Sequence, residues 1–202
     1  FIRRPLGTTQ RHRCIQSQIG GRSRYAIEGS GIMKGYFIEA CSRAGADRDK
    51  NEDNFFAASQ MASSSDEFFS IESPEKLPSP IVCIVADGLG GHEDGETASR
   101  VVIEELVTCI GEGDFKTAIA EGISSAHQKL SLMSRGRRPM GSTVVGIVLG
   151  STQAVFFNVG DSRAYRLGQS NIEQVSEDDL SSSGSHILSQ CIGGGSRLPK
   201  PH

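Results

Sequence analysis

The most constraining feature of this sequence lies in residues 81–96, where an uninterrupted apolar run ends in Asp87 and is followed by several glycines. A short apolar run bounded by turn residues is typical of a buried strand. Such a strand carries one carboxylate, that of Asp87, to the rim of a sheet. Gly88 permits a sharp turn and brings a carbonyl oxygen close to whatever Asp87 binds, which suits a divalent cation with oxygen ligands. The same residues also fit a simpler role, in which Asp87 accepts backbone hydrogen bonds at a strand-to-helix turn.

Composition narrows the class of protein. The chain has 202 residues and a net charge of -3, with 37% apolar and 22% charged residues, which is typical of a globular domain with one core. Charges of both signs are interspersed over most of the chain, so there is no global electrostatic case for nucleic acid. The longest apolar runs, residues 81–86 and 143–149, are too short to cross a bilayer. We therefore expect neither a nucleic-acid partner nor a membrane partner.

The cysteines indicate a reducing compartment. The five of them are widely spaced, and no Cys-x-x-Cys pair occurs, which argues against a disulfide framework and against a structural zinc site. Cys83 and Cys109 fall on apolar faces, where a cysteine is usually a small core residue and not a nucleophile. These observations predict a cytoplasmic location.

The first 32 residues differ from the rest of the chain. They are rich in arginine, have no acidic residue before Glu28 and show no sustained periodicity, so we expect little stable structure there. A basic, acid-poor leader of this kind is compatible with a transit peptide, with an arm that binds nucleic acid, or with an artefactual start to the chain. The expected domain covers residues 33–202 and begins at Met33.

Beyond this leader the pattern predicts strands, then two helices, then strands. The expected strands are residues 35–42, 54–57, 141–149 and 153–167. Apolar residues at steps of three and four predict one helix over residues 96–110 and a second that starts at Asp114, a good N-cap. The last two strands should pair as an antiparallel hairpin. This order predicts an α+β fold with antiparallel sheets and argues against a wound parallel sheet.

Four short motifs stand out on this background. They are Glu52-Asp53, Asp87-Gly88, Gly141-Ser142-Thr143 and Gly160-Asp161-Ser162-Arg163. In order and separation they resemble the metal-dependent protein serine/threonine phosphatases of the PP2C (PPM) family, over roughly residues 36–202. The compact bacterial-type members are the most similar, because residues 188–194 look like the segment before their last motifs. The resemblance implies a β-sandwich of mainly antiparallel sheets flanked by helices, here incomplete at the C-terminus.

The resemblance also implies a role for each acidic residue. Asp87 matches the carboxylate that bridges two Mg²⁺ or Mn²⁺ ions, and Gly88 matches the residue whose carbonyl oxygen binds one of them. Glu52 and Asp53 match the acidic pair that holds these metals directly or through their waters. Asp161 matches a ligand of a third, weaker metal site. Taken without the family, each of these residues also fits a surface or turn position.

The implied reaction is the hydrolysis of phosphoserine or phosphothreonine on proteins by a metal-activated water at a dinuclear Mg/Mn site. Asp87 and Asp53 are the implied catalytic residues, and Arg48 matches the arginine that grips the substrate phosphate through parallel charge-assisted hydrogen bonds. No Ser/His/Asp or Cys/His arrangement stands out, in agreement with a reaction that needs no protein nucleophile. The implied partners are a phosphorylated protein substrate and an opposing serine/threonine kinase pathway, and we expect a monomer.

Two departures from the family pattern lead to an alternative. Leu89 stands where some members have a histidine that protonates the leaving group, as it does in many bacterial relatives. After Asp161 nothing matches the later Asp-Gly-x-x-Asp and Asp-Asn motifs, and Asp178 and Asp179 stand where relatives carry an Asp-His-Ser segment. We therefore expect a C-terminally truncated domain that binds its metals poorly. The alternative function is a catalytically inactive pseudophosphatase or a phosphopeptide-binding regulatory module.

Overall fold

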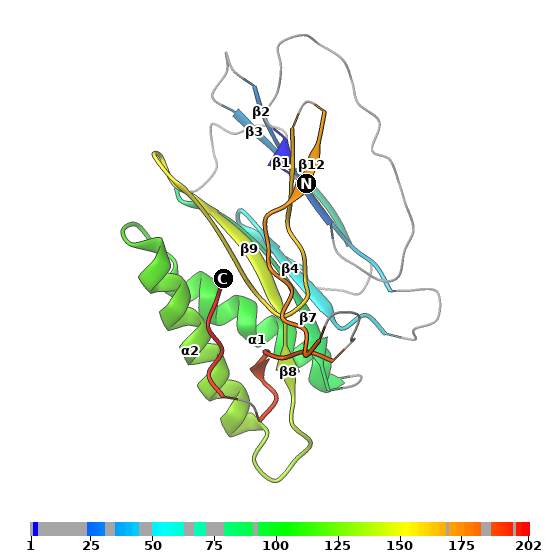
Figure 1. Cartoon of the computed structure of the whole chain (residues 1–202). Coiled ribbons are helices and arrows are strands. Elements are labelled where there is room, and N and C mark those ends of the chain that lie inside the picture. Colours follow the sequence, from blue (N-terminus) through cyan, green and yellow to red (C-terminus); the bar gives the residue numbers. More distant parts are fainter. Residues whose placement is uncertain are drawn as a thin grey trace.

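The computed structural model describes residues 2–3, 24–30, 35–44, 50–62, 67–71, 79–90, 93–168, 170–182, 187–195 and 197–202. Within these ranges two β-sheets pack face to face, and two helices cover the outer face of one of them (Figure 1). The predicted α+β class with mainly antiparallel sheets is confirmed. Neither helix combines the length and the hydrophobicity that a membrane span requires, as far as the described residues go.

The elements follow one another as strands, two helices and strands. The strands are β1 (Ile2–Arg3), β2 (Arg24–Ser30), β3 (Gly35–Ser42), β4 (Asp53–Ala57), β5 (Gln60–Met61), β6 (Glu67–Ile71), β7 (Ile81–Leu89), β8 (Gly141–Ser142), β9 (Val144–Leu149), β10 (Ala154–Val159), β11 (Tyr165–Leu167), β12 (Ile172–Gln174) and β13 (Ile192–Gly193). The helices are α1 (Glu93–Cys109) and α2 (Phe115–Met133). One sheet has the order β12-β11-β1-β2-β3-β6, and the other has the order β10-β9-β7-β4-β5, with β8 and β13 attached beside the end of β7.

The central strand β7 is covered on both faces. Val82 and Ile84 pack with the helices, whereas Ile81 and Cys83 pack into the core between the two sheets. This double burial explains why residues 81–86 are apolar without alternation. Burial also raises the pKa of the Cys83 thiol to about 12, so Cys83 is the inert core residue that the sequence predicts.

The two helices form largely as predicted. Asp114 caps α2, since its carboxylate accepts hydrogen bonds from the Lys116 N–H at 3.1 Å and from the Thr117 hydroxyl at 2.6 Å. The buried stripe of α2 consists of Phe115, Ile119, Gly122, Ile123, Ala126 and Leu130. Helix α1 begins at Glu93, earlier than the predicted residue 96, so its first turn lies closer to Asp87 in the chain than the periodicity indicates.

The N-terminal part differs from the sequence expectation. We expected little stable structure over residues 1–32, but Arg24–Ser30 forms β2 and pairs antiparallel with β3. Tyr25 and Ile27 give this segment a brief alternating pattern, which is too short to predict a strand without its partner. The boundary between leader and domain at residue 33 stays a prediction.

Candidate functional site

Two of the predicted metal ligands lie side by side. Asp53 of β4 is paired with Asp87 of β7. The next position along is a hydrogen-bonded pair, because the Gly88 N–H donates to the Glu52 carbonyl at 3.2 Å. Asp53 and Asp87 therefore occupy a non-hydrogen-bonded pair, in which both side chains are on the same face and their Cβ atoms are about 4.5–5.5 Å apart.

The carboxylate pair lies at the rim of the core between the sheets. Side chains alternate along a strand, so Asp53 shares its face with Phe55, and Asp87 shares its face with Cys83. Both Phe55 and Cys83 belong to the inter-sheet core. Asp53 is half-buried and Asp87 is exposed. The pair is thus fixed by the sheet on one side and open to solvent on the other.

Thr143 joins Asp87 to the Gly-Asp-Ser-Arg motif. Its N–H donates to the Asp87 carbonyl at 2.9 Å, and its hydroxyl accepts from the Asp87 N–H at 3.2 Å. The same hydroxyl shares a 2.6 Å hydrogen bond with the Ser162 hydroxyl. The Ser142 hydroxyl also donates to the Asp87 carbonyl, at 2.9 Å. The Gly-Ser-Thr motif therefore bonds directly to the backbone of Asp87, and the Gly-Asp-Ser-Arg motif is joined to it through Thr143.

Glu52 lies against α1 and not beside the two aspartates. An added Cβ at Gly95, in the first turns of α1, would be 2.5 Å from Glu52 Oε2. The Glu52 carbonyl accepts from the Ser99 hydroxyl at 2.6 Å, and this hydroxyl also accepts from the Asn54 side chain at 2.9 Å. These bonds tie the start of β4 to α1. Across the described ranges, no three His, Cys, Asp or Glu side chains lie close enough together to hold a metal ion, so neither Glu52 nor Asp161 completes a trio with the pair.

Asp179 anchors the turn that carries Asp161, a role the sequence did not reveal. The Asp179 carboxylate accepts from the Gly160 N–H at 2.8 Å, and the Asp179 N–H donates to the Gly160 carbonyl at 3.0 Å. Asp179 is only 7% exposed, and the Gln190 amide donates to its carboxylate at 2.8 Å. Asp161 itself is half-buried. Only the fold brings these residues together, since no local pattern links Asp179 to Gly160.

Two histidines outside the carboxylate pair have shifted pKa values. The Asp179 carboxylate, 2.9 Å from His202 Nε2, raises the pKa of His202. His127 Nδ1 accepts a hydrogen bond from the Gly193 N–H at 3.1 Å, and desolvation lowers the pKa of His127. The two shifts have opposite signs and therefore opposite consequences for stability.

We expect stability to depend on both histidines, in opposite pH ranges. Because the pKa of His202 is raised in the folded protein, this histidine adds to the free energy of unfolding at pH values below its pKa in the unfolded chain. That stabilisation is lost as pH rises through the pKa of the folded state. Because the pKa of His127 is lowered in the folded protein, this histidine adds to the free energy of unfolding at pH values above its pKa in the unfolded chain. That stabilisation is lost as pH falls through the pKa of the folded state. Urea unfolding across pH should show that His202→Gln removes the alkaline loss and His127→Gln the acid loss. Profiles parallel to that of the unsubstituted chain would contradict the assignment.

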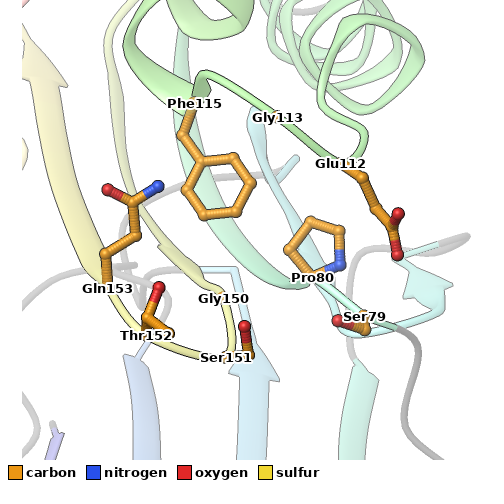
Figure 2. A pocket seen from close by; sticks show the side chains of 9 residues that line it. All are labelled: Ser79, Pro80, Glu112, Gly113, Phe115, Gly150, Ser151, Thr152 and Gln153. Atoms are coloured by element: carbon orange, nitrogen blue, oxygen red, sulfur yellow. The ribbon is translucent and has the colours of Figure 1, made fainter.

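A pocket with a volume of about 300 Å³ lies at the opposite end of the central strands (Figure 2). It is lined by Ser79, Pro80, Glu112, Gly113, Phe115, Gly150, Ser151, Thr152 and Gln153. Figure 2 shows the Phe115 ring between Gln153 and Pro80. Because β7 begins at Ile81 and six residues of extended strand span about 20 Å, the pocket is separate from Asp87. Arg48, the residue implied to bind phosphate, lies outside the described residues.

The chain has two facing sheets, two helices on the outer face of one sheet and a carboxylate pair at the rim. This arrangement is an α+β sandwich. The family model described as Protein phosphatase 2C matches residues 62–188. The chain therefore belongs to the protein phosphatase 2C family, as the four motifs predict.

Curated relatives match part of this chain. Serine/threonine phosphatase stp of Listeria welshimeri is 32% identical over 109 residues, which cover 49% of this chain and 43% of the relative. Serine/threonine protein phosphatase PstP of Mycobacterium tuberculosis is 29% identical over 101 residues, which cover 47% of this chain and 20% of the relative. The chain thus spans less than half the length of these curated relatives.

Solved structures share the fold at lower identity. The S. agalactiae serine/threonine phosphatase superimposes with a TM-score of 0.63 at 20% identity, over 83% of this chain and 73% of that one. The catalytic domain of PstP, solved in complex with 2 manganese ions, gives a TM-score of 0.57 at 23% identity, over 82% of this chain and 70% of that one. These likenesses confirm the predicted PP2C-like fold.

Proposed function

We propose that this protein hydrolyses phosphoserine and phosphothreonine on proteins in a reaction that depends on Mg²⁺ or Mn²⁺. The observation that carries the proposal is the side-by-side placement of Asp53 and Asp87 at the open rim of the inter-sheet core. Family membership supports it, because the curated relatives are serine/threonine phosphatases. The natural substrate would be a phosphorylated protein, and a serine/threonine kinase pathway would add the phosphate that this protein removes.

The residues at the rim fit hard divalent cations. Asp53 and Asp87 offer carboxylate oxygens, and Gly88 offers a carbonyl oxygen, which are the donor types that Mg²⁺ and Mn²⁺ prefer. Two carboxylates directly opposite on neighbouring strands can both offer oxygens to one cation, which would favour their shared negative charge. By analogy with PstP, solved with 2 manganese ions, we propose that Asp53, Asp87 and Gly88 would hold two cations and that Asp161 would contribute to a third, weaker site.

The chain's own residues prepare this site before substrate arrives. Bound cations would lower the pKa of a coordinated water and neutralise charge on the phosphoryl group. Thr143 and Ser142 fix the backbone of Asp87 from one side, and pairing with β4 fixes it from the other. Preorganisation of this kind lowers the reorganisation needed in the reaction. Glu52, tied to α1, remains a proposed ligand of the metals or of their waters, and Arg48 remains the proposed phosphate ligand.

A second candidate is a phosphopeptide-binding module without turnover. It is favoured by the fact that the described residues bring two of the proposed acidic ligands together, and not three. Such a module would use the same rim to bind phosphate without activating a water. Phosphate release distinguishes the two functions, because only the enzyme consumes its ligand.

The test is metal removal. We expect the chain to release phosphate from a phosphothreonine peptide with Mn²⁺ present, to stop when EDTA removes the metal, and to resume when Mn²⁺ or Mg²⁺ is restored. Released phosphate is measured directly, with the unphosphorylated peptide as a blank. Hydrolysis that is insensitive to EDTA would rule out the proposed chemistry. Peptide binding without phosphate release would instead support the binding module.

A further inference from the structure

The loop between α2 and β8 presents three exposed arginines, Arg135, Arg137 and Arg138. In Figure 1 this loop projects beyond β8 at one end of the molecule. The Arg137 side chain is 63% exposed and lies 3.3 Å from Asp94. In the part of the chain that the structure describes, the side chains of Arg135 and Arg138 have no acidic partner. The loop therefore gathers three positive side chains, of which Arg135 and Arg138 have no acidic partner among the described residues.

The base of this loop is closed by Ser134. The Ser134 hydroxyl donates to the Leu130 carbonyl at 2.8 Å and accepts from the Met140 N–H at 3.2 Å, so one side chain joins the two ends of the loop. Backbone N–H groups of Ser134 and Arg135 satisfy carbonyls of the last turn of α2. The arginine side chains are thus not needed to cap the helix, and they are held on a closed loop.

The loop leads directly to the candidate site. Gly141, the first residue after Met140, pairs with Leu89, and Ser142 pairs with Gly88. Arg138 is three residues before Gly141, which is at most about 10 Å of chain, and the strand pair adds about 5 Å. Asp94, the partner of Arg137, lies in the first turn of α1. The loop accordingly lies next to the strand end that carries Asp87, with Arg137 on the side covered by α1.

We propose that this loop is a docking surface for acidic side chains next to the phosphorylated residue of a peptide substrate. The inference rests on the proposed function, which places the phosphorylated residue at Asp53 and Asp87. Guanidinium groups pair well with carboxylates through parallel hydrogen bonds. An extended peptide advances about 3.3 Å per residue, so a separation of up to about 15 Å corresponds to Asp or Glu up to about five positions from the phosphoresidue. The loop also offsets the repulsion that such a peptide meets from the acidic rim.

The experiment compares two peptides in Mn²⁺, each with a non-hydrolysable phosphonate in place of the phosphate of threonine. One carries Glu three to five positions away on both sides, and the other carries Gln. We expect the full chain to bind the Glu peptide about 5–20-fold more tightly at low salt in fluorescence anisotropy, and Arg135→Ala/Arg138→Ala to abolish most of this preference. The preference should also fall as salt is added.

A matched control removes two positive charges elsewhere. Lys116 lies at the other end of the 19-residue helix α2, about 28 Å from the loop, and Arg166 is in β11 of the other sheet. Lys116→Ala/Arg166→Ala should keep the preference, and an equal loss would overturn a specific docking surface. Equal affinities for the two peptides, no binding of the Glu peptide, or tighter loop-dependent binding of single-stranded DNA would also overturn it. The proposed function is tested separately, by Mn²⁺-dependent phosphate release from an ordinary phosphothreonine peptide.

Discussion

Replacing Asp87 by asparagine is expected to lower Mn²⁺-dependent phosphate release by more than about 100-fold, because the amide keeps the shape of the side chain and loses its charge. Asp87 is exposed, and its backbone is held by Thr143 and Ser142, so the substitution should leave the fold in place. The expected cause is weaker cation binding, which is measured by titrating Mn²⁺ against each protein. Unchanged phosphate release by Asp87→Asn would exclude the proposed site.

The matched control for Asp87→Asn is Glu104→Gln. Glu104 is an exposed carboxylate on the solvent side of α1, and its replacement removes the same charge from a residue outside the rim. We expect the rate of phosphate release by Glu104→Gln to be within about twofold of that of the unsubstituted chain, because salt screens an exposed charge that is remote from the site. A large loss in both variants would indicate a general effect of net charge, and not a role for the rim.

The parts of the fold that the sequence predicts are those with a local signal. The apolar run that ends at Asp87, the stripe of α2 and its N-cap Asp114 are each read from neighbouring residues, and each is present. The pairing of β2 with β3 has no such signal, because the strand depends on a partner. A pattern this short does not indicate which neighbouring strand the segment will pair with, and that partner is part of the topology.

The candidate site shows the same division. The motif order predicts Asp53 and Asp87 as members of one site, and strand pairing brings them together. Strand alternation separates Glu52 from them, because consecutive residues face opposite sides of a strand and Glu52 meets α1. Asp179, in contrast, is not predicted to belong to the site, but it is buried and its carboxylate holds the turn before Asp161. The direction of each carboxylate is therefore set by tertiary contacts, which the motif order alone does not contain.

Gly88→Ala is expected to destabilise the protein by about 3 kcal/mol or more. A Cβ at Gly88 would overlap the backbone carbonyl of Gly95 in α1 and would lie 2.9 Å from the Glu52 carbonyl oxygen. Backbone atoms on both sides cannot rotate away as a side chain can, so α1 or β4 must move. Either movement displaces Asp87 relative to Asp53, so the residual folded protein should also lose phosphate release. Urea unfolding and the phosphate assay measure the two effects.

The comparison that makes the Gly88 prediction specific is Gly111→Ala. Gly111 follows α1 and has open space where a Cβ would be added, so its substitution should change the free energy of unfolding by less than about 0.5 kcal/mol. The same chemical change thus has a large effect at one glycine and almost none at the other. If both variants unfold at similar urea concentrations, the close contact between α1 and Gly88 does not hold the rim, and the positioning of the carboxylate pair must come from the pairing with β4 and from Thr143 and Ser142.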